Sequence, residues 1–292
     1  MHAFSWFLPV MFGCAPPDPV VEPIPNTDSG SDSGSDSDVV EPTPDLDALW
    51  GPEDTTTAPF TRGMVSFTFD DGWLGQATIA SPKLVERGWK GTFYLVPEWF
   101  GTSMDGEAFM TLSGASDLVA AGHEIGDHTM SHATLTNLVE PEVFDEMADC
   151  QLSLESTLGL PPGAVANFST PHGAYNDAVL ADARLLFTSH RTGEARLNTP
   201  ATDPYTLGGV LLEASNLDYP GRTPDDVEDV IQLTAERRSW LILVFHGFVE
   251  GELMRVTDQP LDAFDRILDE VAEADVDVVT IAEGVQRMPH PP

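Results

Sequence analysis

The chain of 292 residues has room for one large domain with extensions or for two ordinary domains, and its hydrophobic fraction of 41% is normal for a protein with a buried core. Its 48 acidic residues against 13 Lys and Arg give a formal net charge of -35, which argues against nucleic acid as a partner and favours a neutral or cationic polymer. The two cysteines are too few for a disulfide framework or a cysteine-ligated zinc site, and nothing in the sequence indicates an oligomer.

The first residues form a short apolar run, 3–12, which is too short to span a bilayer and ends at Gly13-Cys14. The run resembles a bacterial lipoprotein signal, in which the peptide is cut before Cys14 and the thiol takes a lipid. It departs from that pattern because Met11 and Phe12 stand where Leu and a small residue are usual, and because no Lys or Arg precedes the run. We expect residues 1–14 to be the signal, the location to be extracytoplasmic, and the membrane to be contacted only through the lipid. Plain secretion is the alternative.

Residues 15–60 show no hydrophobic periodicity and contain the stretch TDSGSDSGSDSD among several prolines. Such a composition cannot bury enough apolar surface to offset the entropy of ordering. We interpret this segment as a disordered acidic linker, and a neutral coil of about 45 residues would average roughly 35–40 Å from end to end. The linker would hold a folded domain away from the membrane.

From residue 61 to the C-terminus, β-rich runs alternate with helical patterns, which predicts βαβ units and a parallel sheet. About seven such units favour a distorted (β/α) barrel over an open sheet. We therefore predict one α/β domain over residues 61–292. The predicted strands are 64–69, 91–96, 123–127, 165–168, 187–190, 209–212, 240–245 and 277–281, and the predicted helices are 78–87, 116–121, 141–158, 178–186, 225–237 and 261–272.

Polar residues follow several of the predicted strands. In α/β barrels the loops that leave the carboxyl ends of the strands converge on a catalytic rim, so these side chains are expected to lie together. They are Asp70, Asp71, His128, His172 and His246.

Two segments, one with the paired aspartates and one with paired histidines, have the residue types of a catalytic metal site. In Asp70-Asp71-Gly72 the two carboxylates point in different directions, so one can bind a cation while the other handles protons. His128 and His132 are four residues apart and can grip one ion. One Asp and two His leave open positions for water and substrate. Taken alone, each pattern has a plain structural interpretation: Asp-Asp-Gly is usually a turn, and His246 after an apolar strand can be a core histidine.

Three segments resemble motifs of the polysaccharide deacetylases, the NodB-homology family that is also called carbohydrate esterase family 4. They are TFDDG at 68–72, GHEIGDHTMSH at 122–132 and ILVFHG at 242–247, and the resemblance extends from about residue 62 to the C-terminus. It implies a distorted (β/α) barrel and one divalent metal, usually Zn²⁺ and sometimes Co²⁺ or Ni²⁺. The implied roles are metal binding for Asp71, His128 and His132, general base for Asp70 and general acid for His246.

The third motif of the family falls on 168–173, where the sequence FSTPHG stands in place of an Arg-bearing RPPYG-type stretch. Pro171 and Gly173 match, so the resemblance implies that His172 offers its backbone N–H to the oxyanion. Ser169 stands where the Arg that orients the catalytic Asp is usual. Arg191 is the better candidate to replace that Arg and Arg222 is the other, while the alternative is that Arg191 is an ordinary surface residue.

The fourth motif is unclear, and its nearest match is NLDY at 216–219. There Asp218 would tune His246 and Tyr219 would form an aromatic wall. Trp73 either forms part of a platform for sugar rings or packs in the core.

The predicted function is that of a metal-dependent hydrolase that removes acetyl groups from an N-acetylated polysaccharide, whether chitin-like, peptidoglycan or poly-N-acetylglucosamine. Two alternatives are an O-acetyl esterase of the xylan type and a non-catalytic surface lipoprotein that binds carbohydrate. Hydrolysis of a small cyclic amide is a further alternative.

Overall fold

The computed structural model describes residues 56–212, 224–249 and 258–289. The signal, most of the linker and the residues Cys14, Asp218, Tyr219 and Arg222 lie outside these ranges. Phe60, at the end of the range interpreted as linker, is buried, and its N–H donates to the carbonyl of Arg238. None of the helices in the described ranges combines the length and the apolarity that crossing a bilayer requires.

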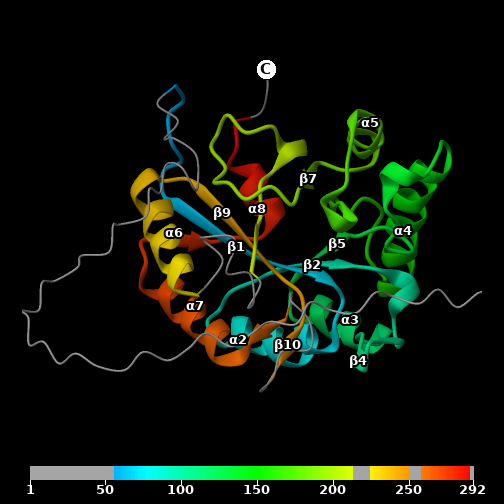
Figure 1. The fold of residues 1–292 in the computed structure, drawn as a ribbon, viewed down its shortest axis with the longest axis horizontal. Helices are drawn as coiled ribbons and strands as arrows, with labels where there is room; N and C mark the ends of the chain where they lie inside the picture. The colour runs from blue at the N-terminus through cyan, green and yellow to red at the C-terminus, as the bar shows by residue number, and fades with distance from the viewer. Residues whose placement is uncertain (1–55, 213–223, 250–257, 290–292) are drawn as a thin grey trace, which may run out of the picture. The chain divides into compact units, whose positions relative to one another are not determined.

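One parallel sheet organises the described residues, and β1 lies near its centre (Figure 1). The strand order is β7-β6-β5-β2-β1-β9-β8, and the eighth strand, β12, shares one edge of β1 with β2. The bounds are β1 Gly63–Asp71, β2 Thr92–Leu95, β5 Glu124–Asp127, β6 Asn167–Ser169, β7 Ser189–Arg191, β8 Val210–Leu211, β9 Trp240–Phe245 and β12 Val276–Val278.

The sheet bends back on itself. A parallel bridge joins Arg191 at the end of β7 to Leu207, which precedes β8, and β8 in turn pairs with β9. Leu207 donates its N–H to the carbonyl of His190 and accepts from the N–H of Thr192. The predicted distorted (β/α) barrel is confirmed, and its seven-strand path curls toward closure at this bridge.

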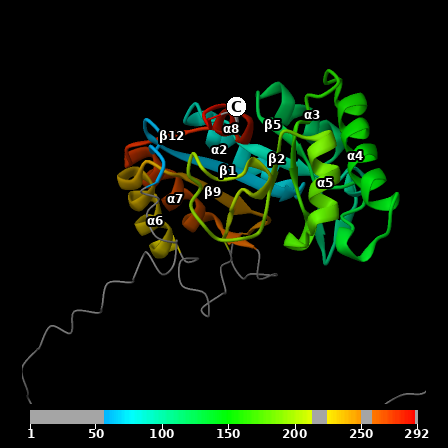
Figure 2. The same ribbon diagram turned by 90° about the horizontal axis from the view of Figure 1, so that it is seen from above.

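Helices cover the sheet on two sides (Figures 1 and 2). The helices α6 and α7 pack together beside β1 and β9, while α4 and α5 lie together beyond β5 and β6. The bounds are α2 Ser81–Glu86, α3 Leu112–Ala120, α4 Glu142–Leu158, α5 Asp177–Leu186, α6 Pro224–Arg237, α7 Leu261–Glu273 and α8 Ile281–Gln286. A π-helix, η1 Gln76–Ala80, precedes α2, and 3₁₀ turns occur at η2 Pro97–Trp99, η3 Leu135–Asn137, η4 Pro171–Gly173 and η5 Pro204–Thr206.

Two small sheets lie beside the main one, namely the antiparallel pair β3 Ser103–Met104 with β4 Glu107–Ala108 and the parallel pair β10 Phe248–Val249 with β11 Gln259–Pro260.

Aromatic residues fill the core between the sheet and the helices on the α7 side. All nine residues of β1 are buried, as expected of a parallel strand that is covered on both faces. The ring of Phe69 stacks on Phe93 at 4.5 Å and on Phe245 at 5.5 Å, and Phe264 of α7 meets Phe245 edge-on at 5.1 Å. Each such side chain contributes roughly 1.5–3 kcal/mol by burial, so this stack is a main source of rigidity for β1.

A partly buried polar network lies at the opposite end of the barrel from the carboxyl ends of the strands. The carboxylate of Glu124 accepts from the hydroxyl of Thr92 at 2.9 Å, from the N–H of Ala282 at 3.1 Å and from the amide of Asn167. Burial raises the pKa of Glu124, and these donors work against that rise. The network ties the start of α8 to β2, β5 and β6, which is a stabilising role typical of this end of a barrel.

Candidate active site

The two adjacent aspartates end β1 and are both buried. Asp70 keeps an extended backbone and pairs with Tyr94 of β2, whereas Asp71 has φ 79° and Gly72 has φ 85°. A positive φ is uncommon for a residue that carries a Cβ and is found mainly where function requires it. This turn directs the two carboxylates to different partners.

The two histidines lie in the loop that follows β5, and the backbone of that loop is firmly held. Thr129 and His132 have φ 65° and 64°. The carboxylate of Asp127 accepts from the N–H of Thr129 at 2.9 Å, and that of Glu146 on α4 accepts from the N–H of Ser131 at 3.0 Å. These bonds hold the loop so that both imidazoles face β1.

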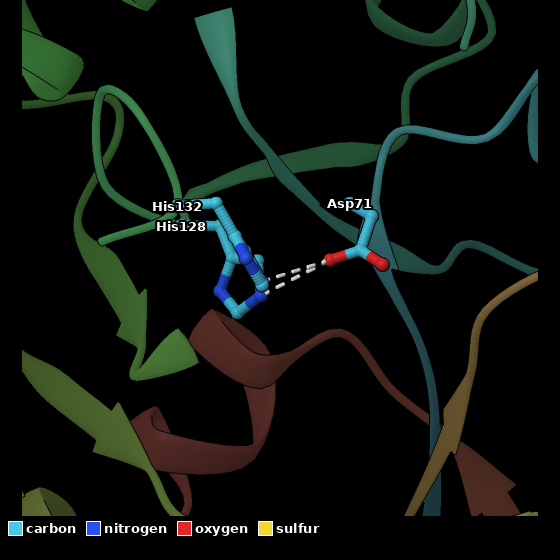
Figure 3. Close-up of side chains that lie close together, drawn as sticks. All are labelled: Asp71, His128 and His132. Atoms are coloured by element: carbon cyan, nitrogen blue, oxygen red, sulfur yellow. Dashed lines mark ion pairs between the residues drawn. The ribbon is translucent and has the colours of Figure 1, made fainter. Parts of the chain in front are cut away.

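The three residues meet at one point (Figure 3). Asp71 Oδ1 lies 3.5 Å from His128 Nε2 and 3.3 Å from His132 Nε2, and the three ligand atoms all lie within 4.8 Å of one another. Two ligands at about 2.1 Å from a tetrahedral Zn²⁺ are roughly 3.4 Å apart, so this spacing fits one ion. Asp71 Oδ1 is buried and has no hydrogen-bond partner within the described ranges, which is expected of an atom that faces a cation.

A second layer of contacts orients these ligands. His128 Nδ1 donates to the carbonyl of Ser169 at 2.7 Å, which leaves Nε2 with its lone pair free for a metal. The indole of Trp73 donates to Asp71 Oδ2 at 3.0 Å, so Oδ1 is the oxygen that faces the histidines. Burial alone would raise the pKa of Asp71, but His128 and His132 hold it well below its ordinary value. The carboxylate is therefore ionised, as a metal ligand must be.

The other aspartate has a cationic partner. Arg191 at the end of β7 donates through Nη2 to Asp70 Oδ2 and to Ser169 Oγ, and its guanidinium lies 5.2 Å from the ring centre of Tyr94. The side chains of Arg191 and Asp70 are only 5% and 6% exposed. Asp70 Oδ1, in contrast, is buried without a partner in the described part of the chain. One oxygen of Asp70 is thus fixed and the other is free to accept a proton.

The loop after β6 carries His172, which has φ 58° inside η4. Its ring meets that of His132 edge-on at 4.5 Å, and partial burial together with the imidazoles of His132 and His128 lowers its pKa. Just before it, Thr170 is hydrogen-bonded to His190 Nε2. His190 Nδ1 donates to the carbonyl of Tyr205 at 2.9 Å, so the hydroxyl of Thr170 is the donor in that bond. The loop after β6 is therefore held to β7 by this hydrogen bond.

His246 follows β9 and is partly buried. Its Nδ1 is buried and has no hydrogen-bond partner among the described residues. Asp218, which the sequence pattern assigns to tuning this imidazole, lies outside the described residues.

The two aspartates, the histidines His128, His132, His172 and His246, and Arg191 border one cavity of about 690 Å³. It brings together every described residue that the sequence analysis selected for the site, namely Asp70, Asp71, Trp73, His128, His132, His172, Arg191 and His246. Trp73 is 5% exposed and stacks on Phe109 at 4.0 Å. It therefore packs in the core and supports the candidate metal ligand Asp71, and it offers little surface to a sugar ring. Sequence reasoning did not select Trp99, Thr170, Tyr175 or Glu194, which also border the cavity.

A buried carboxylate paired with arginine lies beside an Asp-His-His cluster at the rim of the α/β barrel, an arrangement that can hold one divalent ion next to a proton acceptor. Residues 57–187 match the family model for polysaccharide deacetylase. The match covers the segment from β1 to α5, which includes Asp70, Asp71, His128, His132 and His172.

Two chitin deacetylases are among the similar curated proteins. Chitin deacetylase 1 of Cryptococcus neoformans var. grubii is 26% identical over 168 residues, which cover 53% of this chain and 32% of that protein. The chitin deacetylase of a Pestalotiopsis species is 33% identical over 106 residues, which cover 36% of this chain and 34% of that protein. The chain thus matches about a third of the length of these relatives.

Solved structures share the fold at low identity. The Xyl-CE4 domain of a multidomain xylanase from the hindgut metagenome of Trinervitermes trinervoides has a TM-score of 0.55 and 19% identity, covering 78% of this chain and 91% of that domain. A structure described as a CE4 family pseudoenzyme from Bacillus anthracis has a TM-score of 0.52 and 17% identity, covering 77% of this chain and 66% of that chain. Because a pseudoenzyme has this fold, activity depends on the residues of the site and does not follow from the fold.

Proposed function

We propose that this protein is a metal-dependent deacetylase that removes acetyl groups from an N-acetylated polysaccharide. One observation carries the proposal: Asp71 Oδ1 lies 3.3 and 3.5 Å from the two Nε2 atoms of His132 and His128, directly beside the arginine-paired Asp70. A divalent metal held by these three residues, Zn²⁺ with Co²⁺ or Ni²⁺ as alternatives, would supply the Lewis acid that polarises the acetyl carbonyl.

The chain's own residues perform the proton transfers in this proposal. Asp70 Oδ1, whose partner oxygen is fixed by Arg191, takes the proton of the attacking water. The backbone N–H of His172, presented by the turn at positive φ, donates to the developing oxyanion. The ring of His246, on the neighbouring strand end, protonates the departing nitrogen.

The substrate class rests on charge and on similarity. A formal net charge of -35 disfavours anionic polymers and suits a neutral acetylated glycan and its cationic product. The similarity to chitin deacetylases supports an amide of N-acetylglucosamine over an ester. The open cavity of about 690 Å³ has room for a sugar residue beside the candidate metal ligands.

The test is an acetate-release panel with metal-reconstituted protein on chitin oligomers, peptidoglycan, poly-N-acetylglucosamine and acetylated xylan. We expect acetate from at least one N-acetylated glycan, and Asp70→Asn should retain the metal while losing at least 100-fold in kcat. Asp269→Asn, which removes a surface carboxylate paired with Arg87, is the matched control and should leave kcat unchanged.

Release from acetylated xylan alone would replace the proposal with an O-acetyl esterase. Glycan binding without acetate release from any substrate would favour the non-catalytic alternative. Full activity in Asp70→Asn would refute the assigned base.

We also propose an extracytoplasmic location with a lipid on Cys14, and the sequence around that residue is its only support. Mass spectrometry of the mature N-terminus tests this proposal. An unmodified Cys14 within an uncut chain would refute it.

A further inference from the structure

A single buried amide links the strand ends that carry the two proposed catalytic groups. Gln76, the first residue of η1, is fully buried. Its Nε2 donates to the backbone carbonyl of Asp70 at the end of β1 and, at 3.1 Å, to the backbone carbonyl of His246 just after β9. Both bonds come from one nitrogen, so the two carbonyls are held close together.

The position of this amide relative to the sheet gives it a specific consequence. The parallel pairing of β1 with β9 runs from Met64↔Trp240 to Phe69↔Phe245. Asp70 and His246 are the next residues of the two strands, where that pairing has stopped. The amide of Gln76 thus continues the connection between the strands one step beyond the ladder, at the two residues proposed as base and acid.

The local backbone explains how Gln76 reaches this place. The chain turns sharply at Gly72 and enters a π-helix, whose wide turns are frequent at functional sites. Gly75 lies against the segment after β9, because a Cβ on it would be 3.4 Å from the Cβ of Phe248. The helix therefore packs against the chain that follows His246, and the side chain of Gln76 is directed between the two strand ends.

We propose that Gln76 is a positioning residue that fixes the separation of Asp70 and His246. This inference rests on the proposed deacetylase function, because it assigns Gln76 a role in the reaction. The amide contacts only the backbone of the two residues, so it acts through their placement and takes no part in proton transfer.

The competing explanation is that Gln76 only satisfies buried carbonyls and thereby stabilises the fold. The chain contains a matched control for this alternative. Gln151 on α4 also donates through Nε2 to two backbone carbonyls, those of Val165 at 2.8 Å and Leu186 at 3.2 Å, and it does not border the cavity. Removing the amide of Gln151 therefore loses the same kind of bonds away from the site.

The experiment compares Gln76→Met with Gln151→Met in the full chain, loaded with Zn²⁺ and assayed on the glycan that the wild type deacetylates. We expect Gln76→Met to lower kcat about 10- to 100-fold with KM within twofold, because displacements on the order of 1 Å at reacting groups have effects of that size. Gln151→Met should lower the melting temperature to a similar extent and leave kcat within twofold. An unchanged kcat in Gln76→Met, or an equal loss in both variants, would overturn the proposal.

A readout without metal or substrate separates this inference from the proposed function. In metal-free protein, hydrogen exchange in peptides that cover 66–73 and 243–248 should accelerate about fivefold to tenfold in Gln76→Met and stay unchanged in Gln151→Met. Inactive wild-type protein would refute the deacetylase function, whereas unaltered exchange in Gln76→Met would refute the link between the strand ends. A second variant, Gln76→Glu, keeps the shape of the side chain but lacks the amide donor. If neither Gln76 variant folds, the residue has a structural role and the proposal is overturned.

Discussion

Replacing Arg191 with Met should destabilise the protein by about 3–5 kcal/mol, because it leaves the carboxylate of Asp70 buried without a counter-charge. The two side chains are 5% and 6% exposed, so water screens the pair very little. At a separation of about 3 Å and an effective dielectric constant of about 20, the Coulomb attraction is roughly 5 kcal/mol, which agrees with that range. The assay is urea unfolding of metal-free protein followed by linear extrapolation to water.

Two further variants make the result specific to the ion pair. Arg191→Met combined with Asp70→Asn removes both charges and should be more stable than Arg191→Met alone, by about 2 kcal/mol. Arg87→Met removes the exposed pair with Asp269, whose side chains are 26% and 69% exposed, and should cost less than about 1 kcal/mol. If Arg191→Met costs no more than Arg87→Met, or if the double variant is the least stable, the buried-pair reasoning is wrong.

Two other predictions concern the metal ligands and pH. Trp73→Phe keeps the aromatic contact but removes the hydrogen bond to Asp71. The affinity for Zn²⁺, measured by competition with a chelator, should therefore fall about 10- to 100-fold. The control Trp89→Phe, away from the cavity, should leave the affinity unchanged. Burial lowers the pKa of His190 to about 4 from its ordinary 6.5. Between pH 6.5 and 4 the unfolded chain therefore binds a proton at this residue that the folded chain does not bind. The free energy of unfolding should fall across this range, by as much as about 3 kcal/mol from this residue. His190→Gln should remove this part of the pH dependence, and an unchanged slope in denaturant unfolding would contradict the assignment.

Much of the fold could be predicted from the sequence because the strongest signals are local. The apolar run Trp240–Phe245 is a strand with the predicted bounds, and the helix predicted at 141–158 begins one residue later, at Glu142. The strand predicted at 277–281 was wrong at its end. Thr280 and Glu283 form a capping box, so a helix begins at Ile281, and this Thr-x-x-Glu pattern was visible in the sequence.

Other elements were missed where a local signal was weak or was not used. The hairpin of β3 and β4 turns at Asp105-Gly106, with φ 52° and 89°, and Asp-Gly is a strong signal for such a turn. The helix predicted at 116–121 begins earlier, at Leu112, because the side chain of Thr111 caps it by accepting from the N–H of Gly114.

The candidate metal ligands could be predicted because they stand at the ends of predicted strands with a recognisable spacing. Their supporting contacts could not, because they join residues that are distant in the sequence and often use backbone atoms. The carbonyl of Ser169 that orients His128 leaves no sequence signal. The same holds for the amide of Gln76 and for the bond between Thr170 and His190.

Arg191 places a positive charge beside Asp70 from a sequence position other than the one that the family resemblance implies. The family resemblance places an orienting Arg at Ser169 on β6, and in this chain Ser169 is the direct partner of Arg191 in the parallel pairing of β6 with β7. Side chains at paired positions of neighbouring strands share a face of the sheet and lie about 5 Å apart, a gap that an Arg side chain can span. The register of the sheet therefore brings the guanidinium of Arg191 from β7 to both the hydroxyl of Ser169 and the carboxylate of Asp70.

A rescue variant tests whether the charge beside Asp70 can come from β6. Placing the Arg back on β6, as Ser169→Arg combined with Arg191→Ser, exchanges the two side chains at one pair of the ladder and keeps the total volume. We expect it to recover at least half of the stability lost in Arg191→Met, together with measurable acetate release. If the exchanged variant is as unstable as Arg191→Met, then the contacts of Arg191 with Tyr94 and with the carbonyl of Thr192, and not its charge beside Asp70, explain why Arg stands at this position.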